Sequence, residues 1–350
     1  MAEVFGIMNN TFLKACRGEP VPYTPVWLMR QGGRFIPRYR ELQAKYGFLA
    51  LCRTPELAAE ATMLPISVVD VDSVILFSDI LTTAEPMGMP LRYDEATGPH
   101  FISPVRNKAD VDQLVIPNPQ ERLGFMMEAA KIVANELKGK VPNIGFAGAP
   151  FTMAAYMVEG GASNRFFYPR KMMFEAPEVF SALVAKVAKL TTEYLRAQIK
   201  AGVDAIMYFD SLAKIVGPAE YERFALPFMK ESIASLKSEG VPIIYYVNGS
   251  APLLDLIRKT RPDMVGLDYR TNLGWAIKQL GKDIAVQGNL DPYAMLAPPQ
   301  QMEAQVKGIL TEGKKAKGHV FNLGDGILPE TTIEQAKRLV DAVHRLSRAN

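Results

Sequence analysis

Two arginines and two glycines near the start of this 350-residue chain could bind an anion. Arg30 and Arg34 flank Gly32 and Gly33. A guanidinium group holds a carboxylate through two parallel hydrogen bonds, and a glycine lets the backbone approach a ligand or take a positive φ. The pattern suggests a carboxylate clamp, and surface arginines on a glycine loop are the alternative.

Asp79 is a second candidate, because it comes just after the apolar run 75–77. An ionised carboxylate accepts hydrogen bonds and cannot donate them, so it suits a ligand that presents several N–H groups. A cap for the following turn is the alternative, since Asp is a favoured N-cap residue. Tyr156 and Ser211 add neutral hydrogen-bonding groups, and each could instead be structural.

Other catalytic patterns have little support. The sequence has no Gly-x-Ser-x-Gly, and no histidine is near Ser211 along the chain. His100, His319 and His344 do not have the spacing of metal ligands. Neither nucleophilic serine chemistry nor a metal site is therefore expected.

Eight short apolar runs, each ending in a polar residue or a glycine, predict β-strands. They are Val26–Met29, Ser73–Phe77, Asn143–Ala147, Ala205–Phe209, Ile243–Val247, Met264–Leu267, Ile284–Gln287 and Val320–Leu323. Segments with helical spacing lie between them, for example Pro55–Val69, Pro177–Ala201, Pro218–Ser238, Pro299–Thr311 and Thr332–Leu346.

Eight alternating strand and helix units predict an α/β fold, a single (β/α)8 TIM barrel with its active site at the carboxyl ends of the strands. A doubly wound open sheet is the alternative, but no Gly-x-Gly-x-x-Gly is present. We expect one domain over residues 1–350, because no linker divides the chain, with an insertion around Pro86–Pro119.

Composition excludes several classes of function. The net charge of +3 is too small to predict nucleic-acid binding. The longest apolar run, Ile144 to Val158, is shorter than the roughly 20 residues of a membrane helix and contains Pro150. Cys16 and Cys52 lack CxxC spacing, and no secretory signal is recognised, so we expect a cytoplasmic protein.

Long ordered motifs resemble the uroporphyrinogen decarboxylase family from end to end. They are Pro25 to Arg34 with Tyr39-Arg40, Phe77 to Leu81, Gly145 to Thr152, Tyr156 to Gly160, Phe209 to Ser211, Gln287 to Pro292 and Asn322 to Thr331. The resemblance implies a (β/α)8 barrel, a homodimer, and removal of carbon dioxide from the four acetates of uroporphyrinogen without metal or cofactor.

The resemblance also implies roles for individual residues. Asp79 would bind the pyrrole N–H groups, and Arg30 and Arg34 would hold acetate or propionate groups. The remaining substrate contacts would come from Gln31, Gly32, Gly33, Tyr156, Ser211 and Asp325.

Asp325 departs from the family, which normally has histidine at this position. Gly32 and Leu212-Ala213-Lys214 are smaller departures. An ionised Asp325 would repel a substrate carboxylate at about 4 Å by about 1 kcal/mol in water and about 4 kcal/mol at a dielectric constant near 20. Lys214 could neutralise Asp325, or Asp325 could be protonated. If Asp325 is a handicap, Asp325→His should raise kcat/KM.

Two other functions are kept as alternatives. A diverged relative could hold a tetrapyrrole without decarboxylating it, an idea motivated by Asp325 alone. A corrinoid-linked methyltransferase would need a zinc site of thiolate and histidine, but both cysteines lie early in the chain and no His-x-Cys occurs.

Overall fold

A parallel sheet of seven strands forms the centre of the molecule. The computed structural model describes residues 9–94 and 98–348. Along the sheet the strands follow the order of the chain, β1, β4, β5, β6, β7, β8 and β9, and every neighbouring pair is parallel. Their bounds are β1 Val74–Ile75, β4 Asn143–Gly148, β5 Ala205–Asp210, β6 Ile243–Val247, β7 Met264–Leu267, β8 Ala285–Gln287 and β9 His319–Val320.

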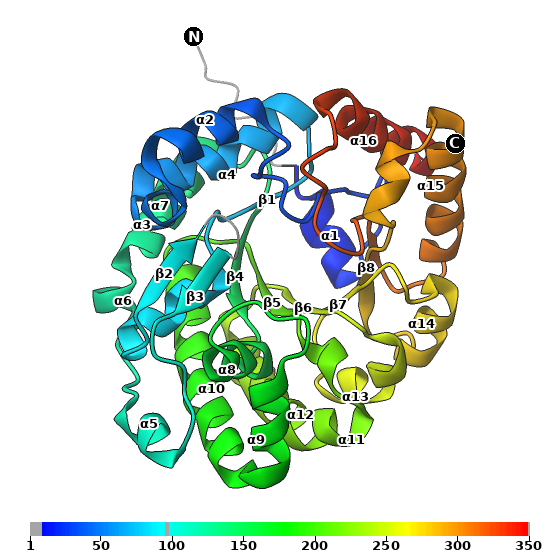
Figure 1. Ribbon diagram of the computed structural model, residues 1–350. Helices are drawn as coiled ribbons and strands as arrows, with labels where there is room; N and C mark the ends of the chain where they lie inside the picture. Colours follow the sequence, from blue (N-terminus) through cyan, green and yellow to red (C-terminus); the bar gives the residue numbers. More distant parts are fainter. Residues whose placement is uncertain (1–8, 95–97, 349–350) are drawn as a thin grey trace.

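Helices surround this curled sheet and connect its strands (Figure 1). They are α1 Thr11–Arg17, α2 Pro37–Tyr46, α3 Phe48–Arg53, α4 Pro55–Val69, α5 Lys108–Gln113, α6 Pro119–Arg122, α7 Gly124–Leu137, α8 Pro150–Glu159, α9 Phe167–Glu175, α10 Pro177–Lys200, α11 Pro218–Phe224, α12 Leu226–Leu236, α13 Leu254–Lys259, α14 Leu273–Leu280, α15 Pro299–Gly313 and α16 Ile333–Ser347. Because all seven strands are parallel, their carboxyl ends meet on one side of the molecule.

The first of the eight predicted strands, Val26–Met29, is not a strand of the sheet in the structure. The described residues contain seven parallel strands rather than a closed barrel of eight, and Val26 forms only an isolated bridge with Phe321. The segment still lies between the two ends of the sheet. Phe321 donates to the carbonyl of Pro25 at 2.8 Å, and Asp72, just before β1, donates to the carbonyl of Val26 at 2.9 Å.

Side chains explain why this segment is not a regular strand. The backbone N–H of Val26 donates to Asp72 Oδ2 at 2.8 Å, that of Leu28 to Gln31 Oε1 at 3.0 Å, and that of Met29 to Asn322 Oδ1 at 2.9 Å. These bonds replace the backbone partners that a strand ladder would supply. An apolar run in the sequence does not reveal that its N–H groups bond to side chains.

The helix predictions agree with the structure to within a few residues, with one exception. α4 has the predicted bounds, and the side chain of Thr332 caps α16 by accepting from Gln335. The predicted helix Pro218–Ser238 is instead divided into α11 and α12 at Ala225. Pro227 lies in the first turn of α12, where its missing N–H costs no helical hydrogen bond.

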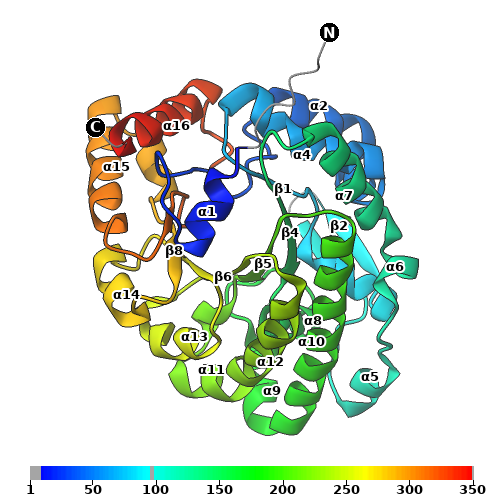
Figure 2. The ribbon, with the colours of Figure 1, turned by 180° about the vertical axis from the view of Figure 1, so that it is seen from behind.

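Helix α1 covers the amino ends of the strands, as the view from behind shows (Figure 2). Phe12 and Cys16 of α1 belong to one buried cluster with Trp27, Met207 and Ile244. This cluster fills the space enclosed by the sheet. The amino end is therefore packed with apolar side chains, and chemistry is left to the carboxyl end.

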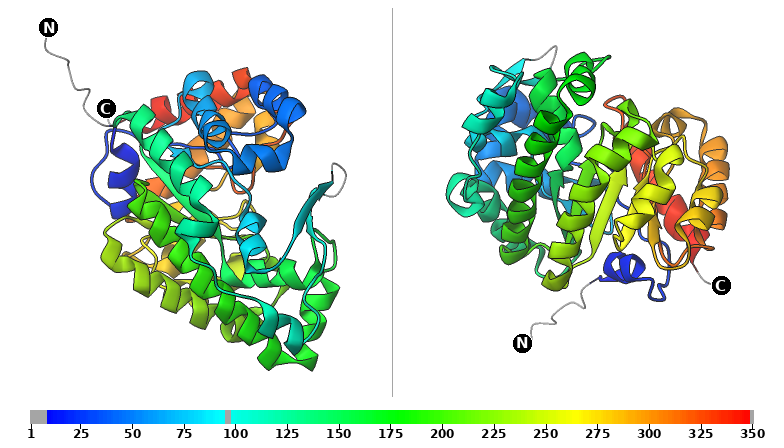
Figure 3. Two further views of the ribbon diagram at one scale, coloured as in Figure 1. Left: turned by 90° about the vertical axis from the view of Figure 1, so that its left-hand side faces the viewer. Right: turned by 90° about the horizontal axis from the view of Figure 1, so that it is seen from below.

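An antiparallel hairpin lies within the stretch 86–119, formed by β2 (Leu91–Asp94) and β3 (Gly98–Phe101). It stands out from the helices near the carboxyl ends of the strands (Figure 3, left). That this stretch is an insertion stays a prediction. No helix in the described part of the chain is long and apolar enough to cross a membrane.

Candidate active site

The loop after Met29 presents two arginines at the carboxyl ends of the strands. Arg30 has a positive φ of 65°, while neither Gly32 nor Gly33 does. A Cβ on Gly32 would lie 2.7 Å from the carbonyl oxygen of Ala61. The missing side chain therefore serves packing against α4.

Arg30 and Arg34 are exposed, and in residues 9–94 and 98–348 neither guanidinium makes a hydrogen bond or an ion pair. The stem of Arg30 lies against the loop after β9, since a Cβ on Gly326 would be 2.5 Å from Arg30 Cδ. Their N–H donors are free for a ligand. Gln31 differs, because its buried amide accepts from Leu28 and donates to the carbonyl of Ser73 at 2.9 Å.

Asp79 has one oxygen bound and one open. It caps the 3-10 helix η1 (Ile80–Met87), where Oδ1 accepts the N–H of Leu81 at 2.8 Å. Burial raises the pKa of the Asp79 carboxyl, while the Leu81 hydrogen bond and the charge of Arg30 act in the opposite direction. Oδ2 has no partner in the described chain, so capping and ligand binding are compatible.

Tyr156 and Ser211 present hydroxyl groups without partners among the described residues. Tyr156 belongs to α8 and packs edge-on against Phe166, with ring centroids 5.5 Å apart. Burial, and next the charge of Asp79, raise its pKa, and Arg30 lowers it. Ser211 follows β5 directly and is partly buried. Arg30, Asp79 and Tyr156 thus share one electrostatic environment.

Asp325, after β9, is held by donors. Oδ1 accepts the N–H of Gly326 at 2.7 Å, and Oδ2 accepts Asn248 Nδ2 at 3.3 Å. Lys214 is exposed and makes no ion pair in the described part of the chain, so it does not neutralise Asp325 by contact. The pKa of nearby Tyr246 is raised by burial and then by Asp325, and Arg30 lowers it.

Sequence reasoning missed Arg270. This residue follows Asp268 and Tyr269 at the end of β7, so the rule that strand ends carry the site would have found it. Arg270 Nε donates to Asp268 Oδ1 at 3.0 Å, and Nη2 donates to the side-chain carbonyl of Asn248. A third guanidinium group therefore lies at the same end of the sheet as Arg30.

The buried carboxyl group of Asp210 helps to hold the loop that carries Ser211 in place. It accepts Thr152 Oγ1 at 2.5 Å and the hydroxyl of Tyr245 at 2.7 Å. Burial raises its pKa to about 6, although both hydrogen bonds act in the opposite direction. Thr152 in turn accepts the N–H of Leu212 at 3.0 Å, which fixes the loop that carries Ser211.

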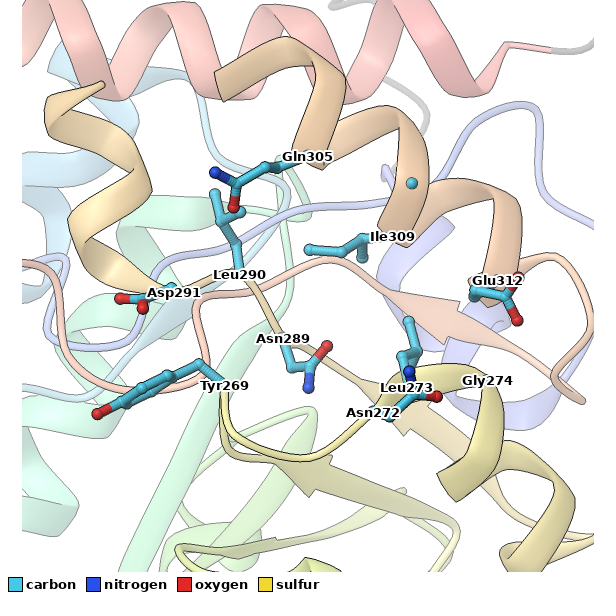
Figure 4. A pocket seen from close by; sticks show the side chains of 11 residues that line it. Tyr269, Asn272, Leu273, Gly274, Asn289, Leu290, Asp291, Gln305, Ile309 and Glu312 are labelled. Carbon is cyan, nitrogen blue, oxygen red and sulfur yellow. The ribbon is translucent and has the colours of Figure 1, made fainter. Parts of the chain in front are cut away.

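A cavity of about 330 Å³ lies between α14, α15 and the loops after β7 and β8. Tyr269 and Asp291 stand at its edge, and Asn289 points toward the loop that precedes α14 (Figure 4). Asn289 Nδ2 donates to the carbonyls of Asp268 and Thr271 at 2.9 and 2.7 Å. The cavity thus borders the loop that presents Arg270.

Taken together, the strand ends present free guanidinium donors, an open carboxylate oxygen and unpaired hydroxyls. Such a set binds a ligand that combines several carboxylates with N–H groups. Arg30, Asp79, Tyr156 and Asp325 are linked by contacts or by their mutual effects on pKa. Arg34 is linked to this group only through Tyr39, whose pKa it lowers against the larger effect of burial.

Comparisons with known proteins agree in fold and identify relatives. A methyltransferase from Methanosarcina mazei has a TM-score of 0.82 over 97% of this chain and 99% of that chain, and its 20% identity supports the fold alone. A family model described as uroporphyrinogen decarboxylase (URO-D) matches residues 8–346. The uroporphyrinogen decarboxylases of Geobacter sulfurreducens and Carboxydothermus hydrogenoformans are 50% and 47% identical over 340 residues, covering 97% of this chain and 99% and 97% of those proteins.

Proposed function

Because the chain belongs to the uroporphyrinogen decarboxylase family, we propose that it decarboxylates the four acetate side chains of uroporphyrinogen III to methyl groups. The products are coproporphyrinogen III and four molecules of carbon dioxide, a step of haem biosynthesis. The enzyme is a carboxy-lyase that uses no cofactor. The observation that carries this proposal is the match of nearly the whole chain to the family.

The substrate's chemistry fits the side chains at the strand ends. Uroporphyrinogen carries four acetates and four propionates around a ring of four pyrrole N–H groups. Arg30 and Arg34 hold carboxylates, and the open oxygen of Asp79 accepts from the pyrrole N–H groups. Tyr156 and Ser211 add hydrogen bonds, and Gln31, Gly32 and Gly33 shape the loop that presents the two arginines. These residue roles are part of the proposal.

The substrate itself provides the electron sink. A proton adds to a pyrrole carbon, and the cationic ring accepts the electron pair that remains when the bond to carbon dioxide breaks. A proton then adds to the resulting methylene carbon, and the ring loses its extra proton. Each cycle therefore consumes one proton and releases one carbon dioxide. Asp79 stabilises the cation through the N–H groups, as preorganised charges stabilise transition states.

One experiment separates this function from its alternatives. Purified protein treated with a chelator is incubated anaerobically with uroporphyrinogen, and the products are followed by mass spectrometry. Stepwise loss of four carbon dioxide molecules is the expected result. Tight binding without loss of mass would instead indicate a tetrapyrrole carrier. Methyl transfer that depends on added zinc would indicate a corrinoid-linked methyltransferase.

We also propose a homodimer. Large side chains near the ends of β7 and β8 are exposed, among them Trp275 at 44% and Tyr293 at 69%, which suits contact with another subunit. Sedimentation equilibrium tests this, and a monomer at micromolar concentration would contradict it.

We also propose that the chain forms a single domain and is located in the cytoplasm. The single domain over residues 1–350 is supported by the one seven-stranded sheet, whose helical connections span most of the chain. The cytoplasmic location is supported by Cys16 and Cys52, which are free thiols in the structure. Fractionation of cells that express the protein tests the location.

A further inference from the structure

The backbone of the loop after β7 is held in place by hydrogen bonds that do not involve the side chain of Arg270. Asp268 is fully buried, and its Oδ2 accepts the N–H groups of Gly249 and Ser250 at 3.0 and 2.9 Å and the hydroxyl of Thr271 at 3.1 Å. Asn289 holds the carbonyls on either side of Arg270, those of Asp268 and Thr271. The backbone on either side of Arg270 therefore has little conformational freedom.

The guanidinium group of Arg270 is oriented but not fully bonded. Asp268 Oδ1 accepts both the backbone N–H and Nε of Arg270 at 3.0 Å, and Asn248 accepts from Nη2. An arginine has five N–H donors, so three remain without a partner in the described chain. Half of the side chain is exposed. These free N–H donors are thus available to a ligand at the carboxyl ends of the strands.

Asn248 connects Arg270 to Asp325. Its amide oxygen accepts from Arg270, and its amide nitrogen donates to Asp325 Oδ2 at 3.3 Å. Because an amide has its oxygen and nitrogen on opposite sides, a donor on one side and an acceptor on the other fix its orientation. The carboxylate of Asp325 therefore determines which face of Asn248 meets Arg270.

Two glycines allow this arrangement by close approach. A Cβ on Gly324 would lie 2.1 Å from the backbone nitrogen of Tyr269, and a Cβ on Gly326 would lie 2.5 Å from Arg30 Cδ. The segments that carry Arg270 and Arg30 thus contact the residues on either side of Asp325.

The order of the strands separates Arg270 from Asp79 along the sheet. β7 is the fourth strand from β1 along the curled sheet, and Asp79 follows β1 (Figure 1). Arg30 precedes β1, on the same side as Asp79. A ring-shaped ligand centred on Asp79 has carboxylates all around its edge, so a guanidinium group on the loop after β7 suits the carboxylates on that side.

We propose that Arg270 is a substrate-binding residue that holds a carboxylate of the tetrapyrrole on the β7 side, and that Asp325 positions it through Asn248 instead of contacting the substrate. The proposal rests on the decarboxylase function. It changes the meaning of Asp325, because a carboxylate that orients an arginine is not a handicap. Asp325→His then lowers kcat/KM, the opposite of the expectation from sequence.

The test measures KM and kcat for uroporphyrinogen with Arg270→Gln, Arg270→Lys and the control Arg122→Gln, an exposed arginine on α6. Arg270→Gln is expected to raise KM roughly 10- to 100-fold, as loss of a charge-assisted hydrogen bond does, with a smaller effect on kcat. Arg270→Lys keeps the charge but cannot bond Asp268 and Asn248 together, so its KM should be intermediate. Melting curves check that each variant is folded.

Asp325→His is then compared in the original chain and in the Arg270→Gln background. The proposal expects a loss of kcat/KM in the first and a clearly smaller loss in the second, because the residue acts through Arg270. A KM within about twofold of the control for folded Arg270→Gln, or equal effects of Asp325→His in both backgrounds, would overturn it. If the unmodified protein releases no carbon dioxide, the decarboxylase function fails instead, which is a distinguishable result.

Discussion

Asp79 shows how one side chain serves both fold and chemistry. Its Oδ1 caps η1 through Leu81, its Oδ2 stays open, and the carboxyl group interacts electrostatically with Arg30 and Tyr156. The sequence left two alternatives for Asp79, a helix cap or a group that binds N–H donors of a ligand. The structure makes them compatible, because one carboxylate oxygen caps the helix and the other is open to a ligand. The type and sequence position of a residue therefore do not show which of its atoms bonds within the protein and which is open to a ligand.

Asp79→Asn separates the two roles. The amide oxygen of Asn can still accept from Leu81, and Asn caps as well as Asp, so the free energy of unfolding should change by less than about 0.5 kcal/mol. The negative charge at the ring centre is lost, and kcat/KM should fall by roughly 10²–10³. Steady-state kinetics and urea unfolding measure both quantities. Unchanged kinetics would mean that Asp79 is only a cap.

The positions of the candidate site residues were predictable where these residues follow an apolar run. Arg30, Asp79, Ser211 and Asp325 come after apolar runs and lie at the carboxyl ends as expected. Arg270 follows the same rule, but the sequence does not show that Asn248, 22 residues away along the chain, accepts from its guanidinium group. The bonding of Gln31 to the backbone was also invisible in the sequence.

Among the elements, the long helices and central strands were predictable and the first strand was not. β6 and β7 have the predicted bounds because their apolar runs are buried throughout. Val26–Met29 has the same kind of run, but Asp72, Gln31 and Asn322 take its N–H groups. The pattern of apolar residues predicts which side chains are buried, but it does not predict the hydrogen-bond partners of the backbone N–H groups.

The loop after β9 depends on its close approach to the loop after β7. In Gly324→Ala the new Cβ would lie 2.1 Å from the backbone nitrogen of Tyr269, and a backbone atom cannot turn aside as a flexible side chain can. We expect a loss of about 1–3 kcal/mol in the free energy of unfolding, together with a raised KM. Urea unfolding and kinetics check this.

Gly308→Ala in α15 is the matched control. No atom lies within 4 Å of its new Cβ. Alanine favours a helix interior over glycine, so the free energy of unfolding should rise by about 0.5–1 kcal/mol with unchanged KM. An equal loss of stability in both variants would show that close approach at Gly324 is not the cause.

For the whole molecule, buried titratable groups predict how stability depends on pH. Burial raises the pKa of Asp210 from 3.8 to about 6. Between these two pH values Asp210 keeps its proton in the folded protein, whereas the same group in the unfolded chain has lost it. Its free energy of unfolding therefore decreases as pH rises, by an amount on the order of 3 kcal/mol from this group. His319 acts oppositely, because burial lowers its pKa to about 4.

Asp210→Asn isolates the first contribution, since His319 and the other groups are common to both proteins. The free energy of unfolding of the variant minus that of the original protein should increase between about pH 4.5 and about pH 7, by about 2 kcal/mol or more. Urea unfolding across this range measures the difference. A difference that does not vary with pH would contradict the raised pKa of Asp210.

The pairing of Pro25 and Trp27 with Phe321 has a consequence for synthesis on the ribosome. About three hundred residues separate the two partners, so at roughly 5–20 residues per second the early segment waits on the order of 15–60 s for its neighbour. During that time Asp72 can bind Val26, but the other side of the segment has no partner. A nascent chain therefore carries an open backbone edge until its last tenth emerges, and a chain that terminates before Phe321 keeps that edge permanently.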